Sequence, residues 1–140
     1  QQSFFRNTST PTVFYLALFD STTAPVVDTN TFSQLTEIPA GNGYTTGGIS
    51  IARNSTDFDV LTEDDTNDYS YIQLKDIVWT ASGGSIPASG AGARYACLTD
   101  DNATQASRDI IVGWDLASNR VVSTGQTLTI QNAEIRFSTV

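Results

Sequence analysis

The sequence contains no histidine and no methionine, and it has one cysteine and one lysine. Without histidine, the chain cannot form the Ser-His-Asp or Cys-His arrangements of nucleophilic catalysis, and most zinc sites are excluded. A single cysteine leaves no internal disulfide. A reactive thiolate needs a basic neighbour, so we interpret Cys97, in the alternating stretch Arg94-Tyr95-Ala96-Cys97-Leu98, as an inert, half-buried packing residue.

Long apolar runs and clustered positive charges are also missing. No run of about 18 apolar residues could form a membrane-spanning helix, and no signal peptide is visible at Gln1. Seven basic residues face 15 acidic ones, for a net charge of −8, and the arginines are scattered. Binding to phosphates requires clustered Lys and Arg. We therefore expect no direct contact with nucleic acid or a membrane.

What the sequence does contain favours β-structure. Its 140 residues suit one domain, and Thr, Ser, Asn, Asp and Gly dominate the polar part. Short strands separated by turn residues predict an all-β fold, an antiparallel β-sandwich or jelly-roll-like barrel. One short helix is expected near residues 31–37. Thr31 is its cap, and Gln34 occupies the capping-box position.

Individual strands are predicted from β-branched and aromatic runs. The stretch YIQLKDIVWTA is expected to be one strand whose apolar phase slips at Lys75 and Asp76, which indicates a β-bulge or a strand buried on both faces. The acidic stretch before it, DFDVLTEDDTNDYSY, is expected to be a loop. The other expected strands are 12–20, the end of 42–54, 92–100, 108–116, 127–130 and 134–137.

Residues 1–12 lack periodicity and contain a proline, so we expect an extended N-terminal arm before a single domain at 13–140. Phe4 and Phe5 are large apolar residues, which either pack on their own domain or dock onto a neighbouring subunit. Together with Arg6 they are candidate interface residues. Ile86 and Pro87, in the glycine-rich connection after Trp79, are further candidates.

Two stretches contain part, but not all, of the pattern of a known ligand-binding site. The glycine-rich connection at 83–92 lacks the lysine and following helix of a phosphate loop, so we interpret it as a flexible turn. The acidic stretch could supply oxygen ligands to calcium, but its spacing is not that of an EF-hand, and a solvated loop is favoured. We predict no cofactor and no catalytic residue. The calcium candidates are Asp57, Asp59, Glu63, Asp64, Asp65 and Asp68.

The order of motifs resembles a family of small structural proteins of tailed bacteriophage virions. The motifs are FYLALFD, GNGYTTGGISIAR, LKDIVWTASGGSIPASGAGARYACLTDD, IVGWDL and TGQTLTI. The resemblance implies a non-enzymatic virion component with an antiparallel β-sandwich, either a head decoration (cement) protein or a tail or fibre protein. It offers no catalytic residues.

From this resemblance we expect a decoration protein on the outer face of the major capsid protein. We expect it to self-associate, as a trimer, in virions assembled in the bacterial cytoplasm. A tail, fibre or head–tail connector component is the first alternative. A carbohydrate-binding β-sandwich module that uses Tyr44, Trp79 or Trp114 as a stacking platform is the second.

Overall fold

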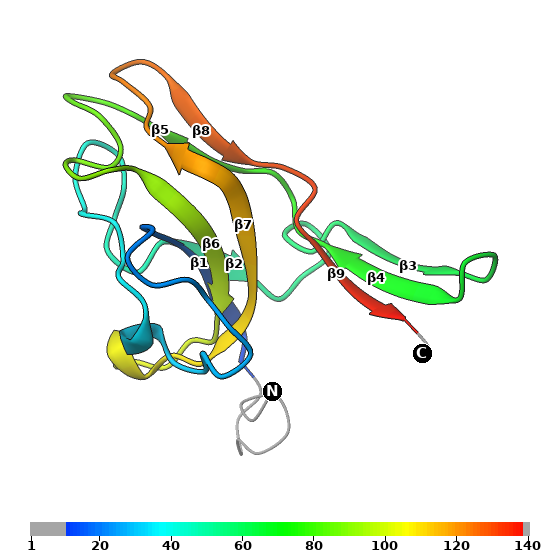
Figure 1. Ribbon diagram of the computed structural model, residues 1–140. Helices are drawn as coiled ribbons and strands as arrows, with labels where there is room; N and C mark the ends of the chain where they lie inside the picture. Colours follow the sequence, from blue (N-terminus) through cyan, green and yellow to red (C-terminus); the bar gives the residue numbers. More distant parts are fainter. Residues whose placement is uncertain (1–10, 139–140) are drawn as a thin grey trace.

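The computed structural model describes residues 11–138, which form nine strands and two single-turn 3₁₀ helices (Figure 1). All strand pairs are antiparallel, so the predicted all-β class is confirmed. Of the predicted arm, only Pro11 and Thr12 are within the described residues. The elements are β1 (Val13–Phe19), η1 (Phe32–Gln34), β2 (Ile49–Ala52), β3 (Val60–Asp64), β4 (Tyr69–Gln73), β5 (Ile77–Thr80), β6 (Ala93–Thr99), η2 (Gln105–Ser107), β7 (Ile110–Arg120), β8 (Thr127–Ile130) and β9 (Glu134–Ser138).

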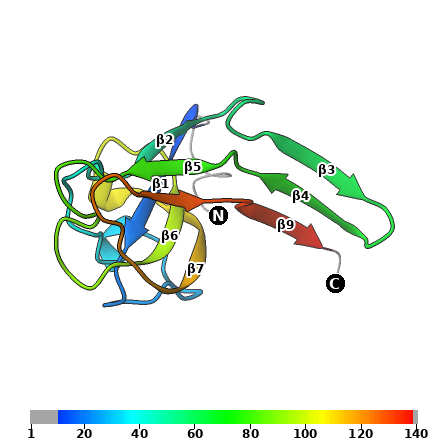
Figure 2. The same cartoon turned by 90° about the horizontal axis from the view of Figure 1, so that it is seen from above.

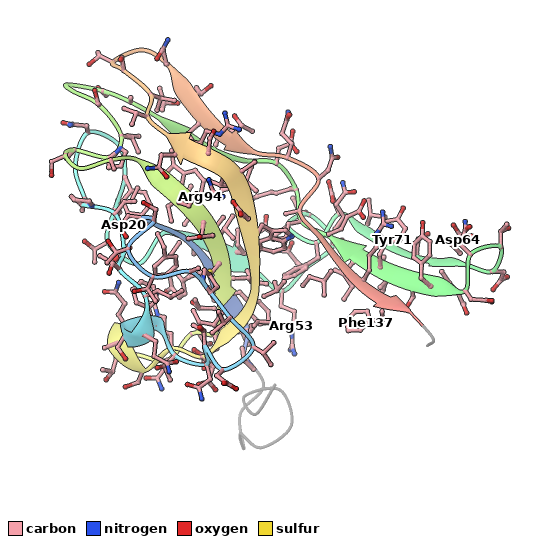
Figure 3. The ribbon with its side chains drawn as sticks, viewed as in Figure 1. Asp20, Arg53, Asp64, Tyr71, Arg94 and Phe137 are labelled. Carbon is pink, nitrogen blue, oxygen red and sulfur yellow. The ribbon has the colours of Figure 1, made fainter. Side chains whose placement is uncertain are left out.

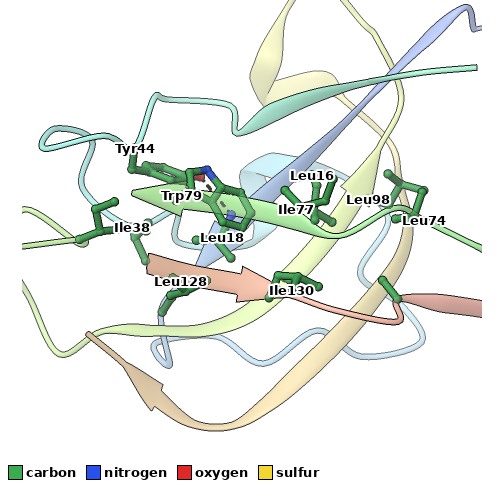
Figure 4. Packing of buried hydrophobic residues seen from close by; sticks show 14 of the residues in the cluster. Leu16, Leu18, Ile38, Tyr44, Leu74, Ile77, Trp79, Leu98, Leu128 and Ile130 are labelled. Carbon is green, nitrogen blue, oxygen red and sulfur yellow. Dashed lines mark hydrogen bonds between the residues drawn. The ribbon is translucent and has the colours of Figure 1, made fainter. Parts of the chain in front are cut away.

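The main part of the molecule, which we call the body, is built on a four-stranded sheet in the order β2-β1-β6-β7. The β5–β8 pair contributes to the same core, where Trp79 and Ile77 of β5 and Leu128 and Ile130 of β8 converge on Leu16 and Leu18 of β1 (Figure 4). Burial of these apolar side chains drives folding of the body.

A second three-stranded sheet, in the order β3-β4-β9, extends away from the body (Figures 1 and 2). We call it the projecting sheet. Its β4–β9 pair continues the β5–β8 pair in the same register, because Gln73 lies opposite Glu134 and Ile77 lies opposite Ile130. The Leu74 N–H donates to the Ala133 carbonyl (2.9 Å) between the two halves. One long antiparallel ribbon therefore runs from the body into the projecting sheet.

This ribbon corrects two predictions. The stretch 71–81 holds two strands, β4 and β5, and the predicted phase slip marks the place where the ribbon leaves the core. The acidic stretch expected to be a loop contains β3, which forms a hairpin with β4. The helix near 31–37 shortens to the 3₁₀ turn η1, in which the Gln34 side chain still accepts a hydrogen bond from the Thr31 N–H (2.9 Å).

Two glycines let the Gly41–Gly48 segment lie directly against neighbouring strands. A Cβ on Gly48 would lie 2.0 Å from the Leu16 carbonyl oxygen, and one on Gly43 would lie 2.1 Å from the Thr80 carbonyl oxygen. Both residues also have positive φ angles (81° and 108°). Glycine is required here by both space and backbone conformation.

The glycine-rich connection between β5 and β6 is anchored, in contrast to the flexible turn expected. Ile86 exchanges two backbone hydrogen bonds with Val122 (2.9 and 3.0 Å), and the Asn42 side chain donates to the Ser85 carbonyl (2.9 Å). Ile86 and Pro87 are both buried. Ile86 therefore belongs to the core and Pro87 is buried next to it in the chain, so neither is exposed for contact with a neighbouring subunit.

Candidate functional site: the projecting sheet

The projecting sheet is less covered by other elements than the strands of the body are. Each residue of β3, and each of β4, is only partly buried or exposed. By contrast, the last four residues of β1 and of β6 are all buried. A sheet that is not covered by its own chain leaves its faces open to a partner.

One face of the projecting sheet is apolar near the body. The register places Leu61, Ile72 and Ile135 in one row across the three strands, and Glu63, Ser70 and Phe137 in the next row outward. Directly paired residues share a face, as do alternate residues along a strand, so these six side chains form one surface. We call it the Leu61 face.

The two most exposed apolar side chains of the projecting sheet lie on this face: Leu61 is 79% exposed and Phe137 is 57% exposed. Figure 3 shows Phe137 on the side of the sheet opposite to Tyr71 and Asp64. Large apolar side chains left in water in neighbouring rows are typical of an interaction surface.

The opposite face is aromatic and charged, and its groups already interact with each other. The Tyr69 and Tyr71 rings lie 5.9 Å apart, and the Arg136 guanidinium lies 4.9 Å from the Tyr69 ring centre. Arg136 also forms an ion pair with Glu134 (2.7 Å). The aromatic and charged side chains of this face are thus already engaged with one another. The Leu61 face is therefore the stronger candidate for binding a partner.

The outer end of the projecting sheet carries concentrated negative charge. Residues 60–73 contain four acidic residues and no lysine or arginine. The turn is organised by Asp64, which accepts hydrogen bonds from the Thr66 and Asn67 N–H groups (3.0 and 3.2 Å) and from the Asn67 side chain (2.9 Å). These hydrogen bonds, that of the Asn67 side chain foremost, lower the pKa of Asp64.

A shallow hollow of about 200 Å³ lies beside this turn. It joins the acidic turn to the outer row of the Leu61 face, because Phe137 and Ser70 line it together with the acidic side chains. The surface thus changes from apolar to acidic along the direction away from the body. The acidic residues that line the hollow are Glu63, Asp64, Asp65 and Asp68.

The junction between body and projecting sheet, which we call the neck, is held by Asp57 and Lys75. Their side chains form an ion pair, and the Lys75 N–H donates to the Asp57 carbonyl (3.0 Å). Asp57 also accepts a hydrogen bond from the Ala52 N–H of β2 (2.7 Å). The Lys75 ammonium, followed by the Ala52 N–H, holds the pKa of Asp57 below its usual range.

The predicted calcium candidates do not form one cluster. Asp57 is at the neck, where it binds Lys75, while Asp64 binds the backbone of its own turn. Within residues 11–138, no group of three or more His, Cys, Asp or Glu side chains is placed to hold a metal ion.

The aromatic residues considered for carbohydrate stacking are mostly internal. Tyr44 and Trp79 are 3% and 2% exposed, and their rings lie 6.1 Å apart in the core. The Tyr44 hydroxyl accepts from the Leu18 N–H (3.0 Å) and donates to Glu37 (2.8 Å). Trp114 is partly exposed, and it lines a groove of about 590 Å³ between β7 and β8.

Cys97 lies in the interior and opposes Gly113 of β7, where a Cβ would approach the Cys97 sulfur to 3.1 Å. Burial raises the pKa of the thiol to about 12, so the thiol is protonated at neutral pH. The interpretation of Cys97 as a packing residue agrees with this position, although the residue is fully rather than half buried.

Leu61 and Phe137 are the site residues that sequence reasoning missed. The signal was present but weak: Val60, Leu61 and Thr62 are strand-forming residues hidden between acidic stretches, and Phe137 lies at the end of a correctly predicted strand. The side-chain alternation predicts which face a residue occupies, but only the path of the ribbon shows that Leu61 and Phe137 on this face are exposed.

We compared the chain with protein-family models, curated proteins and solved structures. No protein-family model, curated protein or solved structure matches it. Among residues 11–138 we find no helix with the length and apolar character needed to cross a membrane.

Proposed function

We propose that this chain is a non-enzymatic structural protein of a tailed bacteriophage virion. In this proposal it is a capsid decoration protein, with a β-sandwich body, that binds the outer face of the major capsid protein and stabilises the head. Copies associate as trimers on particles assembled in the host bacterial cytoplasm. The proposal takes its direction from the motif series in the sequence and its physical support from the projecting sheet.

The observation that carries the proposal is the exposed part of the Leu61 face, around Leu61 and Phe137, beyond the point where Ile135 packs against the core of the body. The body has its own apolar core, whereas the projecting sheet exposes Leu61 and Phe137 beyond it. A self-sufficient body with an extended attachment element suits a subunit that joins its neighbours in a repeating array. Weak contacts gain strength in such an array, because each subunit is held at several points at once.

Charge supports a position on the outside of a shell. With a net charge of −8 and one lysine, the chain is repelled by packaged DNA and by anionic lipid surfaces. The proposal therefore includes the major capsid protein and other copies of this chain as partners, and it includes no direct contact with nucleic acid or membrane.

The direct test adds the purified protein to expanded capsids that lack it and measures co-sedimentation with the heads. We expect saturable binding and a higher temperature of head disruption when the protein is bound. Capsids that neither retain the protein nor gain resistance to heating would contradict the decoration role.

A paired substitution tests the role of the Leu61 face in the same assay. The double variant Leu61→Asp, Phe137→Asp places two charges in the proposed contact, and we expect it to bind more weakly than wild type. Val27→Asp is the matched control, because Val27 is fully exposed in the loop before η1, away from the projecting sheet. If the double variant and Val27→Asp lost capsid binding equally, the Leu61 face would have no specific role in binding.

A tail, fibre or connector component of the same virion is the second candidate, since an exposed attachment sheet serves there equally well. Imaging of labelled particles distinguishes the two, because a decoration protein covers the head in an array and a connector forms a single ring. The carbohydrate-binding hypothesis loses support, since burial of Tyr44 and Trp79 leaves it with Trp114 alone.

A further inference from the structure

We infer that the Leu61 face binds residues 1–10 of a second copy of this chain. This inference deepens the proposed function, since it names the partner of the projecting sheet. Residues 1–10 lie outside the described residues, so the inference rests on the apolar and acidic side chains of the projecting sheet that would bind them. Four features support the inference: matching polarity, matching charge, the order of residues along both partners, and the place where the described chain begins.

The first two features concern composition. The segment QQSFFRNTST carries two adjacent phenylalanines followed by an arginine, and it has no acidic residue. The Leu61 face presents an apolar row beside the body and an acidic hollow beyond it. Phe4 and Phe5 match the apolar row, and Arg6 matches the hollow.

Charge makes this occupant more favourable than another acidic surface of the same protein. Residues 60–73 carry four negative charges and no positive one, so two projecting sheets brought together at their outer ends repel each other. Arg6 is the only charged side chain in residues 1–10. A segment with one cation and two aromatic rings therefore meets the requirements of both parts of the surface.

The order of residues indicates that the donor is another copy. The described chain begins close to the neck, since the Thr12 carbonyl accepts a hydrogen bond from the Arg53 N–H (3.0 Å) and the Phe14 ring lies 5.6 Å from the Phe58 ring. A segment running outward from there along its own projecting sheet meets the apolar row first. Its Arg6 would then lie over apolar side chains.

A segment from a second copy can instead enter at the outer end of the sheet and run towards the neck. Arg6 then lies over the acidic hollow, and Phe5 and Phe4 reach the apolar row beyond it. The resulting contact joins two different surfaces, an arm and a sheet. Such a head-to-tail contact can close into a ring, including the trimer of the proposed function.

Charge reversal tests the inference on the purified full-length chain, without capsids, so that it can fail independently of the decoration role. Arg6→Glu places two carboxylates together, and Glu63→Arg places two cations together. We expect each variant to self-associate at least about tenfold more weakly than wild type in sedimentation velocity, because like charges in contact disfavour association. Asp28→Arg, an exposed acidic residue distant from the projecting sheet, is the control and should associate like wild type.

Mixing the two variants distinguishes a second copy from the chain's own arm. The Glu63→Arg protein retains Arg6, and the Arg6→Glu protein retains Glu63, so contacts between unlike variants are favourable again. The mixture should therefore form dimers that neither variant forms alone, while a ring of three keeps one contact between like variants. Unchanged circular dichroism and Tm of each variant exclude misfolding as the cause.

Three results would overturn the inference. They are a wild-type chain that stays monomeric at its highest soluble concentration, charge-reversal variants that associate as well as wild type, and a mixture without recovery.

Discussion

The body and the projecting sheet use the same kind of strand pairing but differ in what lies against their faces. In the body, β1 and β6 each end in four consecutive buried residues, and both contribute to a core shared with β5 and β8. In the projecting sheet, the hydrogen-bonded ladder is just as regular, yet Leu61 is 79% exposed. Backbone pairing alone therefore does not tell which sheet supports the fold and which one remains available to a partner.

The largest expected effect is a backbone clash inside the body. Gly48→Ala would place a Cβ 2.0 Å from the Leu16 carbonyl oxygen at a φ of 81°. Overpacking and backbone strain together should lower the free energy of unfolding by about 4 kcal/mol. Urea denaturation measures it. Gly125→Ala is the matched control, because its φ is 85° and nothing lies within 4 Å of its Cβ position, so it should lose only about 1 kcal/mol.

The next effect compares one leucine from each region. Leu16→Ala removes a fully buried side chain from the body and should lower the free energy of unfolding by about 3 kcal/mol. Leu61→Ala removes the same atoms from the projecting sheet and should change it by less than about 0.5 kcal/mol. Similar losses for the two variants in urea denaturation would contradict the division between a supporting body and an available sheet.

At the neck the expected effect is smaller and depends on pH. Asp57→Asn removes the ion pair with Lys75 and should cost about 1–2 kcal/mol at pH 7. The pKa of Asp57 is lower in the folded chain than its ordinary 3.8, so the carboxylate stabilises the fold above that pH. Its contribution is lost as the pH falls below that value.

The difference in unfolding free energy between wild type and Asp57→Asn should therefore shrink as the pH is lowered below about 4. Chemical denaturation at a series of pH values measures this difference. A difference that stays constant down to pH about 2 would show that Asp57 acts through its neutral hydrogen bonds alone.

The smallest expected effect is in the outer row of the Leu61 face. Phe137 is 57% exposed, so Phe137→Ser should leave the free energy of unfolding within about 0.5 kcal/mol of wild type. Thermal unfolding followed by circular dichroism provides the measurement. A loss comparable to that of Leu16→Ala would show that Phe137 belongs to a core after all.

The comparison also explains which features the sequence could predict. Strands such as β1 and β6 were predicted closely, because a run of β-branched, aromatic and small apolar residues is typical of a buried strand. The β3 strand was missed because its two apolar residues, Val60 and Leu61, are followed by acidic residues typical of a turn. Neither face of the strand is fully buried, so apolar and polar residues do not alternate strictly along it. At η1, the capping pattern correctly predicted the contact between Thr31 and Gln34, but the helix is shorter than predicted.

The candidate site was harder to predict than the fold. Phe4, Phe5 and Arg6 lie outside the described residues, and their predicted interface role remains a prediction. Ile86 and Pro87 were predicted as interface residues because they lie in a glycine-rich connection that could fit against a neighbour, but the hydrogen bonds between Ile86 and Val122 hold this connection against the core. The exposure of a residue in a connection depends on distant partners, which local sequence patterns do not encode.

The continuous ribbon that joins β4–β9 to β5–β8 has a mechanical consequence. Tension applied to the projecting sheet passes through covalent chain at the neck, and two of the three crossings lead into β5 and β8. These two strands are held in the body by side chains packed in its core, and a pull along the ribbon acts on both strands of the pair together. A pull on the projecting sheet is thus transmitted directly to strands whose side chains are buried in the core of the body.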